Sequence, residues 1–339
     1  MNKLLTVSFL LMVFCVGTVL AQEQNCLELK KLIDTTYNFK PSKLTEDQKN
    51  DKSEKMDTVW EKVKANPKEL IPCLRKEINS RTSDGFFRFD ASNLLIQLDE
   101  SAESKKILIE SYAAVDLDDV NLPYWMPYIA ALGYEGFDTS AAGENWLKHP
   151  NPQYYLPQHG PLSVNKEIGA FIIYGSMDES IATPALVKIA SQEKPPAREI
   201  AVRILLQQAT PESFQALKKL NQKNLSENTR QKINILLTKP KLLTPREGEP
   251  KVTRQKYLDV FQQFVDGKPQ AFFRLATEDP NSDRDAVAVM KPEDIPLIRK
   301  VRRAYVMSAS PHSVEWYKAF TEILMALVWK PELIESKKL

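Results

Sequence analysis

Apolar residues recur at helical spacing near the middle of the chain. In the stretch EIAVRILLQQ, Ile200, Ile204 and Leu205 stand at positions i, i+4 and i+5, and Val202 and Leu206 widen the apolar face. This spacing predicts a helix that is buried on more than one side. The following letters, ATPES, place a threonine, a proline and an acidic residue in the order that favours a new helix start. The segment therefore predicts two consecutive helices joined by a short turn.

The same pattern recurs at intervals of 31 or 32 residues. The triplet at 172–174 precedes the one at 204–206 by 32 positions, and a third triplet at 235–237 follows by 31. Upstream, residues 90–112 show the same order of apolar helix, acidic turn and amphipathic helix. A single helix pair of this size cannot bury both of its faces. Stacking of several pairs in register therefore predicts an all-α solenoid.

The segment REIAVRILLQQATPESFQALKKL resembles the HEAT-repeat family. Members have an arginine near the start of the inner helix, then small and branched apolar residues, then a Pro-Glu turn before the outer helix. The resemblance is clearest over residues 165–239 and implies an α–α superhelix that serves as a protein-binding scaffold. It implies no catalytic residue. Two alternatives stay open, namely tetratricopeptide repeats, whose Trp-Leu-Gly-Tyr pattern is absent, and generic packing of helical hairpins.

The rest of the chain predicts flanking helical regions. Residues 22–239 are the expected HEAT-like repeat domain, and its part before about residue 64 is an N-terminal helical cap. An aromatic insertion at 121–162 interrupts the helical rhythm. Residues 240–252 contain three prolines and predict a linker. Beyond them, periodic apolar residues predict a C-terminal helical region over 253–339.

Residues 1–21 have the features of a secretory signal peptide. A short positively charged start precedes an apolar stretch, and Val19 and Ala21 are compatible with cleavage before Gln22. A retained membrane anchor is the alternative, because the stretch is near the lower length limit for spanning a bilayer. We expect an exported protein, periplasmic or extracellular, that has no integral membrane segment after cleavage.

Cleavage would leave two cysteines, Cys26 and Cys73. An even number of cysteines in an exported protein predicts a disulfide, here between the N-terminal cap and the first repeat. Two buried thiols are the alternative. Two cysteines are too few for a structural zinc site, and we expect neither a metal nor a cofactor.

Charge is nearly balanced overall but uneven along the chain. The chain has 46 basic and 44 acidic residues, a net charge of +2 that argues against a nucleic-acid binder. Residues 84–119 hold nine acidic and three basic side chains, whereas residues 214–256 hold eleven basic and three acidic ones. Two interpretations stay open, namely ordinary solvated helix faces, or a surface that steers a charged partner to one end.

The aromatic insertion is the predicted binding surface. Tyrosine and tryptophan combine a large contact area with a polar tip and are enriched at recognition sites. The predicted binding residues are Tyr124, Trp125, Tyr128, Trp146, His149, Tyr154, Tyr155 and His159. Core packing is the alternative for the aromatic side chains, and the two histidines lack a third metal ligand. An irregular loop is expected from 149 to 160.

We expect this exported scaffold to bind another protein. The alternative is an envelope enzyme acting on polysaccharide or cell-wall material, in which two carboxylates would converge beside the aromatic insertion. The candidate carboxylates are Asp116, Asp118, Asp119, Asp138 and Glu144. A purely structural envelope component is a third interpretation.

The acidic run DPNSDRD resembles the first part of a calcium loop. Acidic or amide side chains alternate at 279, 281, 283 and 285. Such a loop also requires a glycine and a final carboxylate, and Arg284 and Met290 stand at those places. A turn that caps the following helix is therefore favoured over a calcium site.

Overall fold

The computed structural model describes residues 23–38, 44–81, 84–114, 122–148, 153–155, 163–192, 196–238, 242–279, 281–307 and 313–336. Most of these residues are helical, and the only strands among them are two of three residues each. The predicted all-α class is confirmed, and the packing of successive helices agrees with a helical-repeat fold. The predicted signal peptide lies outside the described residues. The chain divides into two compact units between Leu122 and Pro123. The predicted boundaries near 239 and 253 stay predictions.

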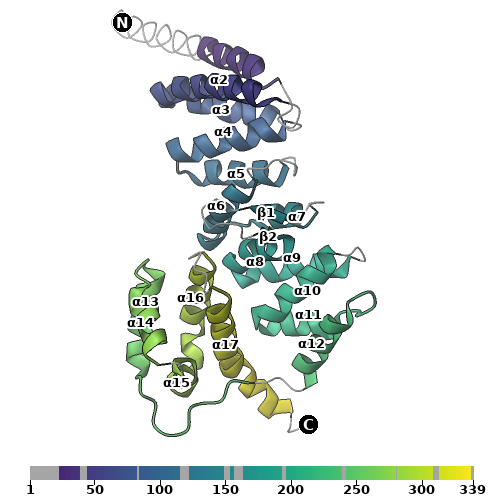
Figure 1. Cartoon of the computed structure of the whole chain (residues 1–339), viewed down its shortest axis with the longest axis vertical. Helices are drawn as coiled ribbons and strands as arrows, with labels where there is room; N and C mark the ends of the chain where they lie inside the picture. Colours follow the sequence, from purple (N-terminus) through teal and green to yellow (C-terminus); the bar gives the residue numbers. More distant parts are fainter. Residues whose placement is uncertain are drawn as a thin grey trace, which may run out of the picture. The chain divides into compact units, whose positions relative to one another are not determined.

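The first unit is a series of helices that pack one on the next (Figure 1). Its elements are a helix over residues 23–36, α2 (Glu46–Ala65), α3 (Pro67–Ser80), α4 (Gly85–Leu98) and α5 (Ala102–Ala114). Val59, Trp60 and Val63 on α2 are buried, as the helical spacing of the predicted cap requires. They share one core with Leu29 and Ile33 of the N-terminal helix.

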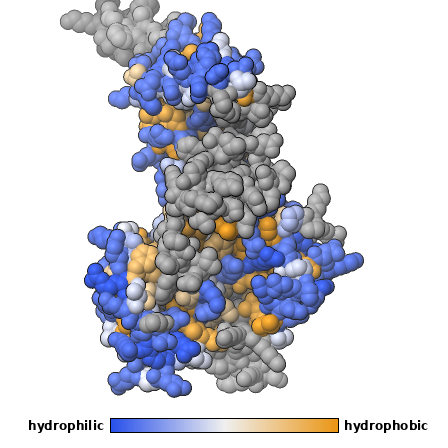
Figure 2. All heavy atoms as spheres, viewed as in Figure 1, coloured by the Kyte–Doolittle hydropathy of each residue, from blue (hydrophilic) through white to orange (hydrophobic). Residues whose placement is uncertain are grey.

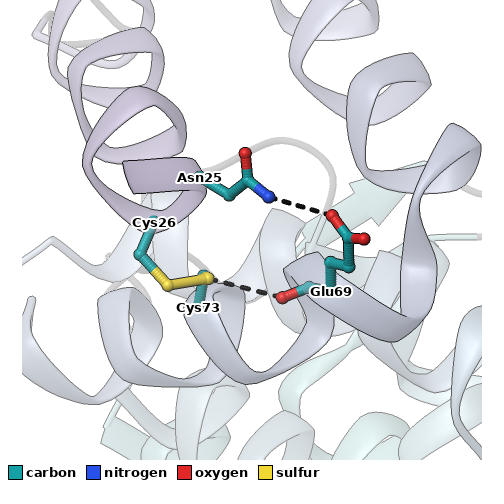
Figure 3. The surroundings of a disulfide bond; sticks show 4 residues. All are labelled: Asn25, Cys26, Glu69 and Cys73. Carbon is teal, nitrogen blue, oxygen red and sulfur yellow. Dashed lines mark hydrogen bonds between the residues drawn. A yellow bond between two sulfur atoms is a disulfide. The ribbon is translucent and has the colours of Figure 1, made fainter. Parts of the chain in front are cut away.

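A disulfide joins Cys26 of the N-terminal helix to Cys73 of α3, as predicted (Figure 3). Beside it, Asn25 donates a hydrogen bond to the Glu69 carboxylate at 2.9 Å. The bridged residues are 47 positions apart. Closing a chain segment of this length removes conformations from the unfolded state, which is worth about 4 kcal/mol in the chain-entropy model. The N-terminal helix is therefore held covalently as well as by its apolar face.

The second unit begins with the aromatic insertion and continues through the repeats. Its first elements are α6 (Leu122–Tyr134), α7 (Ser140–Lys148), β1 (Gln153–Tyr155), β2 (Ser163–Asn165), α8 (Lys166–Ser176), α9 (Glu179–Ser191), α10 (Ala197–Gln208), α11 (Pro211–Lys219) and α12 (Glu227–Thr238). The two strands are antiparallel, with Tyr154 opposite Val164. Part of the stretch that was expected to be irregular, 149–160, is therefore a strand.

The helices from α8 to α12 form two layers. α10 packs against α8 and α12, and α9 packs against α11, so successive pairs lie in register. Ile200, Ile204 and Leu205 are buried, as predicted. Thr210 caps α11 by accepting a hydrogen bond from the Ser213 backbone N–H at 3.0 Å. The capping residues that the sequence places around residue 210 thus mark the start of α11.

The C-terminal helices pack on the repeats within the second unit. Their elements are α13 (Arg254–Val265), α14 (Gln270–Glu278), α15 (Ser282–Val289), a 3-10 turn (Pro292–Asp294), α16 (Ile295–Met307) and α17 (Ser313–Ser336). Phe261, Phe264 and Phe320 lie in an aromatic core. α16 contacts α8 and α17 contacts α10. Phe171 of α8 meets Tyr317 of α17 edge to face, with ring centroids 4.5 Å apart.

Candidate binding surface

The predicted aromatic binding residues have different environments. Tyr128 on α6 is 52% exposed, whereas Trp146 on α7 is fully buried. The structure does not describe the side chains of the other six, which are Tyr124, Trp125, His149, Tyr154, Tyr155 and His159. Of the two predicted binding side chains that the structure describes, Tyr128 is thus the one that lies at the surface.

Trp146 is buried because α7 and α8 interlock through two glycines. Its indole N–H donates to the Lys166 carbonyl at 2.9 Å, and its ring lies so close to Gly169 that a Cβ there would meet ring atoms at 2.1 Å. Conversely, the Tyr174 ring of α8 covers Gly143 of α7, where a Cβ would lie 2.6 Å from it. Burial raises the pKa of Tyr174. Trp146 therefore follows the core-packing alternative and is not available to a partner.

The described carboxylates of the enzyme alternative have structural contacts. Asp138 accepts a hydrogen bond from the Ser140 backbone N–H at 2.9 Å, at the start of α7. Glu144 pairs with Lys148 at 2.8 Å and with Lys188 at 3.7 Å. The hydrogen bond from Lys148 lowers the pKa of Glu144, whereas a general acid in a glycosidase needs a raised pKa. The other candidates, Asp116, Asp118 and Asp119, lie outside the described residues.

An arginine fills the acidic turn that resembled a calcium loop. Arg246 binds both carboxylate oxygens of Asp279 at 2.5 and 2.6 Å, and its Nε lies 3.0 Å from the buried Asp285. The Arg246 hydrogen bonds lower the pKa of Asp279. Asp279 also accepts from the Asn281 backbone N–H at 3.0 Å, just before α15. Arg246 of the predicted linker thus pairs with two carboxylates of the turn, and sequence spacing gave no signal for a partner 33 residues away.

A polar ladder connects three repeats along the layer of α8, α10 and α12. Arg203 of α10 pairs with Glu167 of α8 at 2.7 Å and with Glu199 one turn before it at 3.4 Å. Glu199 accepts a hydrogen bond from the Ser226 hydroxyl at 2.5 Å and another from Thr229 of α12. Burial opposes ionisation of Glu199, but these hydrogen bonds outweigh it and lower its pKa.

Two buried arginines bind the carbonyl ends of repeat helices. Arg198, the arginine near the start of the predicted inner helix, donates to the carbonyls of Ala190 at 3.0 Å, of Lys223 at 2.9 Å and of Asn221. A cation at a helix C-terminus satisfies carbonyls that have no partner within the helix. Arg198 therefore joins the last turn of α9 to the turn between α11 and α12, which is a structural role.

Arg302 of α16 is the second of these arginines and is only 2% exposed. It pairs with Glu179, at the start of α9, at 2.7 Å and donates to the Gln208 carbonyl of α10 at 2.9 Å. The next residue, Ala209, has a left-handed backbone with φ of 50°, a conformation that costs a non-glycine residue about 1–2 kcal/mol. Arg302 thus anchors the C-terminal helices to the strained turn between α10 and α11.

A comparable polar cluster stabilises the first unit. Asp99, between α4 and α5, accepts hydrogen bonds from the hydroxyls of Ser104 at 2.5 Å and Ser101 at 2.9 Å, and pairs with Arg75 of α3. The Ser104 hydrogen bond is the largest cause that lowers the pKa of Asp99 to about 2. The cluster connects successive helices, as the polar ladder does in the second unit.

Within the described ranges, no helix combines the length and apolar character that a bilayer crossing requires. No group of three or more histidine, cysteine, aspartate or glutamate side chains among those residues could hold a metal ion. Comparison with protein-family models, curated proteins and solved structures finds no match to this chain.

Proposed function

We propose that the chain is an exported helical-repeat scaffold of the HEAT-like kind that binds another protein. The observation that carries this proposal is the polar ladder from Glu167 through Arg203 and Glu199 to Thr229. It connects the equivalent layer of three successive repeats, and Glu167 and Glu199 occupy matching positions 32 residues apart. Repeats that stack in this way form an extended surface suited to recognition of a partner.

The disulfide supports the exported part of the proposal. Disulfides persist in oxidising compartments and are rare in the cytosol. Cys26 follows the predicted cleavage point by only a few residues, so the bond would lie at the very start of the mature chain. A protein that loses residues 1–21 during export would form it on leaving the cytosol.

The test is recovery of a partner from the protein's own cell envelope. The mature chain, tagged at its C-terminus, is used as bait, and the bound proteins are identified by mass spectrometry. A matched bait carries Gly169→Leu, which forces a side chain into the indole ring of Trp146 and should disrupt the repeats. We expect a reproducible partner that the intact bait retains and the disrupted bait loses. A well-folded bait that recovers no reproducible partner contradicts the proposal.

A further inference from the structure

The C-terminal helices hold an apolar core that is mostly their own. Its aromatic rings come from α13, α14, α16 and α17 and include Phe264, Phe272 and Phe320. Phe272 and Phe320 stack with ring centroids 5.3 Å apart, and Phe264 meets Phe272 edge to face at the same separation. Among the described residues, Ala209 is the one buried member of this core that the repeats supply. We therefore expect these helices to keep their packing when their contact with the repeats is broken.

Partly buried apolar side chains of the repeats contact this core. Phe171 of α8 meets the Tyr317 ring of α17 with centroids 4.5 Å apart. Gly175, one turn further along α8, leaves room for Val306 of α16, because a Cβ at this position would lie 3.4 Å from the valine. In Figure 2, hydrophobic residues are visible in the middle of the second unit, between mostly hydrophilic sides. The repeats thus offer an apolar patch to the C-terminal helices.

Opposite charges adjoin this apolar patch. Arg302 pairs with Glu179 at 2.7 Å, and the next residue, Arg303, pairs with Asp178 at 2.6 Å. The Arg302 guanidinium also lies 5.2 Å from the centre of the Tyr317 ring, so the charged and apolar contacts are neighbours. The covered face of the repeats is here called the docking face and comprises Phe171, Gly175, Asp178, Glu179 and the carbonyl of Gln208, which accepts from Arg302 at 2.9 Å.

The connection between α12 and α13 is fastened to the C-terminal helices. Its described residues, 242–253, form neither helix nor strand. Arg246 pairs with Asp279 at 2.5 Å and with Asp285 at 3.0 Å, and the Lys251 backbone N–H donates to Asp285 at 3.1 Å. The connection thus tethers the C-terminal helices near the docking face, and the contacts of α16 and α17 hold them on it.

We propose that the docking face binds a basic amphipathic helix of the partner protein, and that the C-terminal helices are a built-in competitor for this face. The partner helix would present two arginines and an apolar side chain, as Arg302, Arg303 and Val306 do within the chain. This inference rests on the proposed scaffold function and adds the chemistry of the partner and a means of regulation. When uncovered, the face presents two carboxylates and a helix-end carbonyl, which attract cations. The same carboxylates repel a polyanion such as nucleic acid.

Charge reversal on α16 uncovers the docking face without changing it. In the full mature chain, Arg302→Glu with Arg303→Glu places two carboxylates opposite Asp178 and Glu179. Amide hydrogen exchange of α8 should rise, whereas α13 and α14 should keep their protection because their aromatic core is intact. The matched control is Arg274→Glu with Lys300→Glu, which changes the charge equally at two exposed cations of α14 and α16 and should leave the exchange of α8 unchanged.

A peptide that copies α16 is the probe for the uncovered face. The peptide spans residues 295–307, is crosslinked to hold it helical and carries a fluorescent label, and its binding is followed by anisotropy. A tethered segment has an effective concentration on the order of millimolar, so the wild-type chain should bind the peptide poorly. The charge-reversal chain should bind it at least about tenfold more tightly, because its own α16 no longer competes. A peptide carrying Arg302→Glu and Arg303→Glu should bind neither chain.

Three results overturn the inference: equal binding of the arginine peptide by the wild-type and charge-reversal chains, equal binding of the arginine and glutamate peptides, or equal increases in the exchange of α8, α13 and α14. As bait in the cell envelope, the charge-reversal chain should recover several-fold more partner than the intact chain. If both chains recover the same amount, the scaffold function stands and the competition is wrong. If no folded bait recovers a partner, the scaffold function itself fails.

Discussion

Replacement of Arg302 by methionine tests the packing of the C-terminal helices on the repeats. Methionine keeps much of the side-chain volume but removes the guanidinium, which pairs with Glu179 at 2.7 Å and donates to the carbonyls of Gln207 at 3.3 Å and Gln208 at 2.9 Å. The variant therefore leaves a largely buried carboxylate and the Gln208 carbonyl without this partner, whereas the Gln207 carbonyl keeps a hydrogen bond from the Thr321 hydroxyl at 3.2 Å.

The expected loss in the free energy of unfolding follows from the burial of the Arg302–Glu179 pair. Arg302 is 2% exposed, and removal of one member of a buried ion pair typically costs 3–5 kcal/mol, roughly, because the remaining charge is uncompensated. The adjacent Arg303 pairs with Asp178 at 2.6 Å, but that carboxylate is 45% exposed. An exposed pair contributes about 0–1 kcal/mol. Arg303→Met is thus a matched control on the same helix.

The assay is amide hydrogen exchange read by mass spectrometry on peptides from α9, α10 and α16, which reports the second unit separately. Arg302→Met should raise the opening equilibrium of these peptides by roughly a hundredfold to a few thousandfold, and Arg303→Met less than about fivefold. Adding Glu179→Gln to Arg302→Met should recover part of the loss. Equal effects of the two arginine variants, or no recovery in the double variant, would refute the reasoning.

Other predictions concern single contacts. Replacing Cys26 and Cys73 by serine should destabilise the first unit by about 2–4 kcal/mol, measured by urea unfolding; an unchanged midpoint would argue against the bond. Gly169→Ala should lower the melting temperature because of the indole ring beside it, whereas Gly175→Ala on the same helix, whose nearest neighbour would be 3.4 Å away, should not. Serine hydroxyls hold the pKa of Asp99 at about 2, so the first unit should lose about 1 kcal/mol, after allowance for solvent screening, as pH falls from about 4 to 2. Asp99→Asn should remove that acid sensitivity, and an unchanged pH profile in the variant would contradict it.

Local signals in the sequence predicted much of the fold. Periodic apolar residues identified α10 and α13, and the Thr210 cap marked the turn before α11, because helix starts and buried faces depend on neighbours within a few residues. The pairing of Cys26 with Cys73 followed from their even number. The helices and the cap are encoded by residue type and short spacing, and the disulfide by the number of cysteines.

Contacts between distant residues could not be predicted in this way. Arg246 fills an acidic turn that lies 33 residues further on, and Arg302 pairs with Glu179, which is 123 residues earlier. The burial of Trp146 depends on Gly169, which lacks a side chain at the point where the two helices touch. The aromatic cluster alone did not distinguish a binding surface from a core, because that distinction depends on the helix packed against it.

Photo-crosslinking in the cell envelope tests the central claim of a protein-binding scaffold most directly. A photoreactive phenylalanine analogue replaces Ile235, which is 57% exposed at the end of the repeats, or Leu27, which is 47% exposed on the N-terminal helix. The account predicts one reproducible protein adduct from the probe at 235 and none from the probe at 27. No adduct from position 235, or the same adducts from both positions, would contradict it.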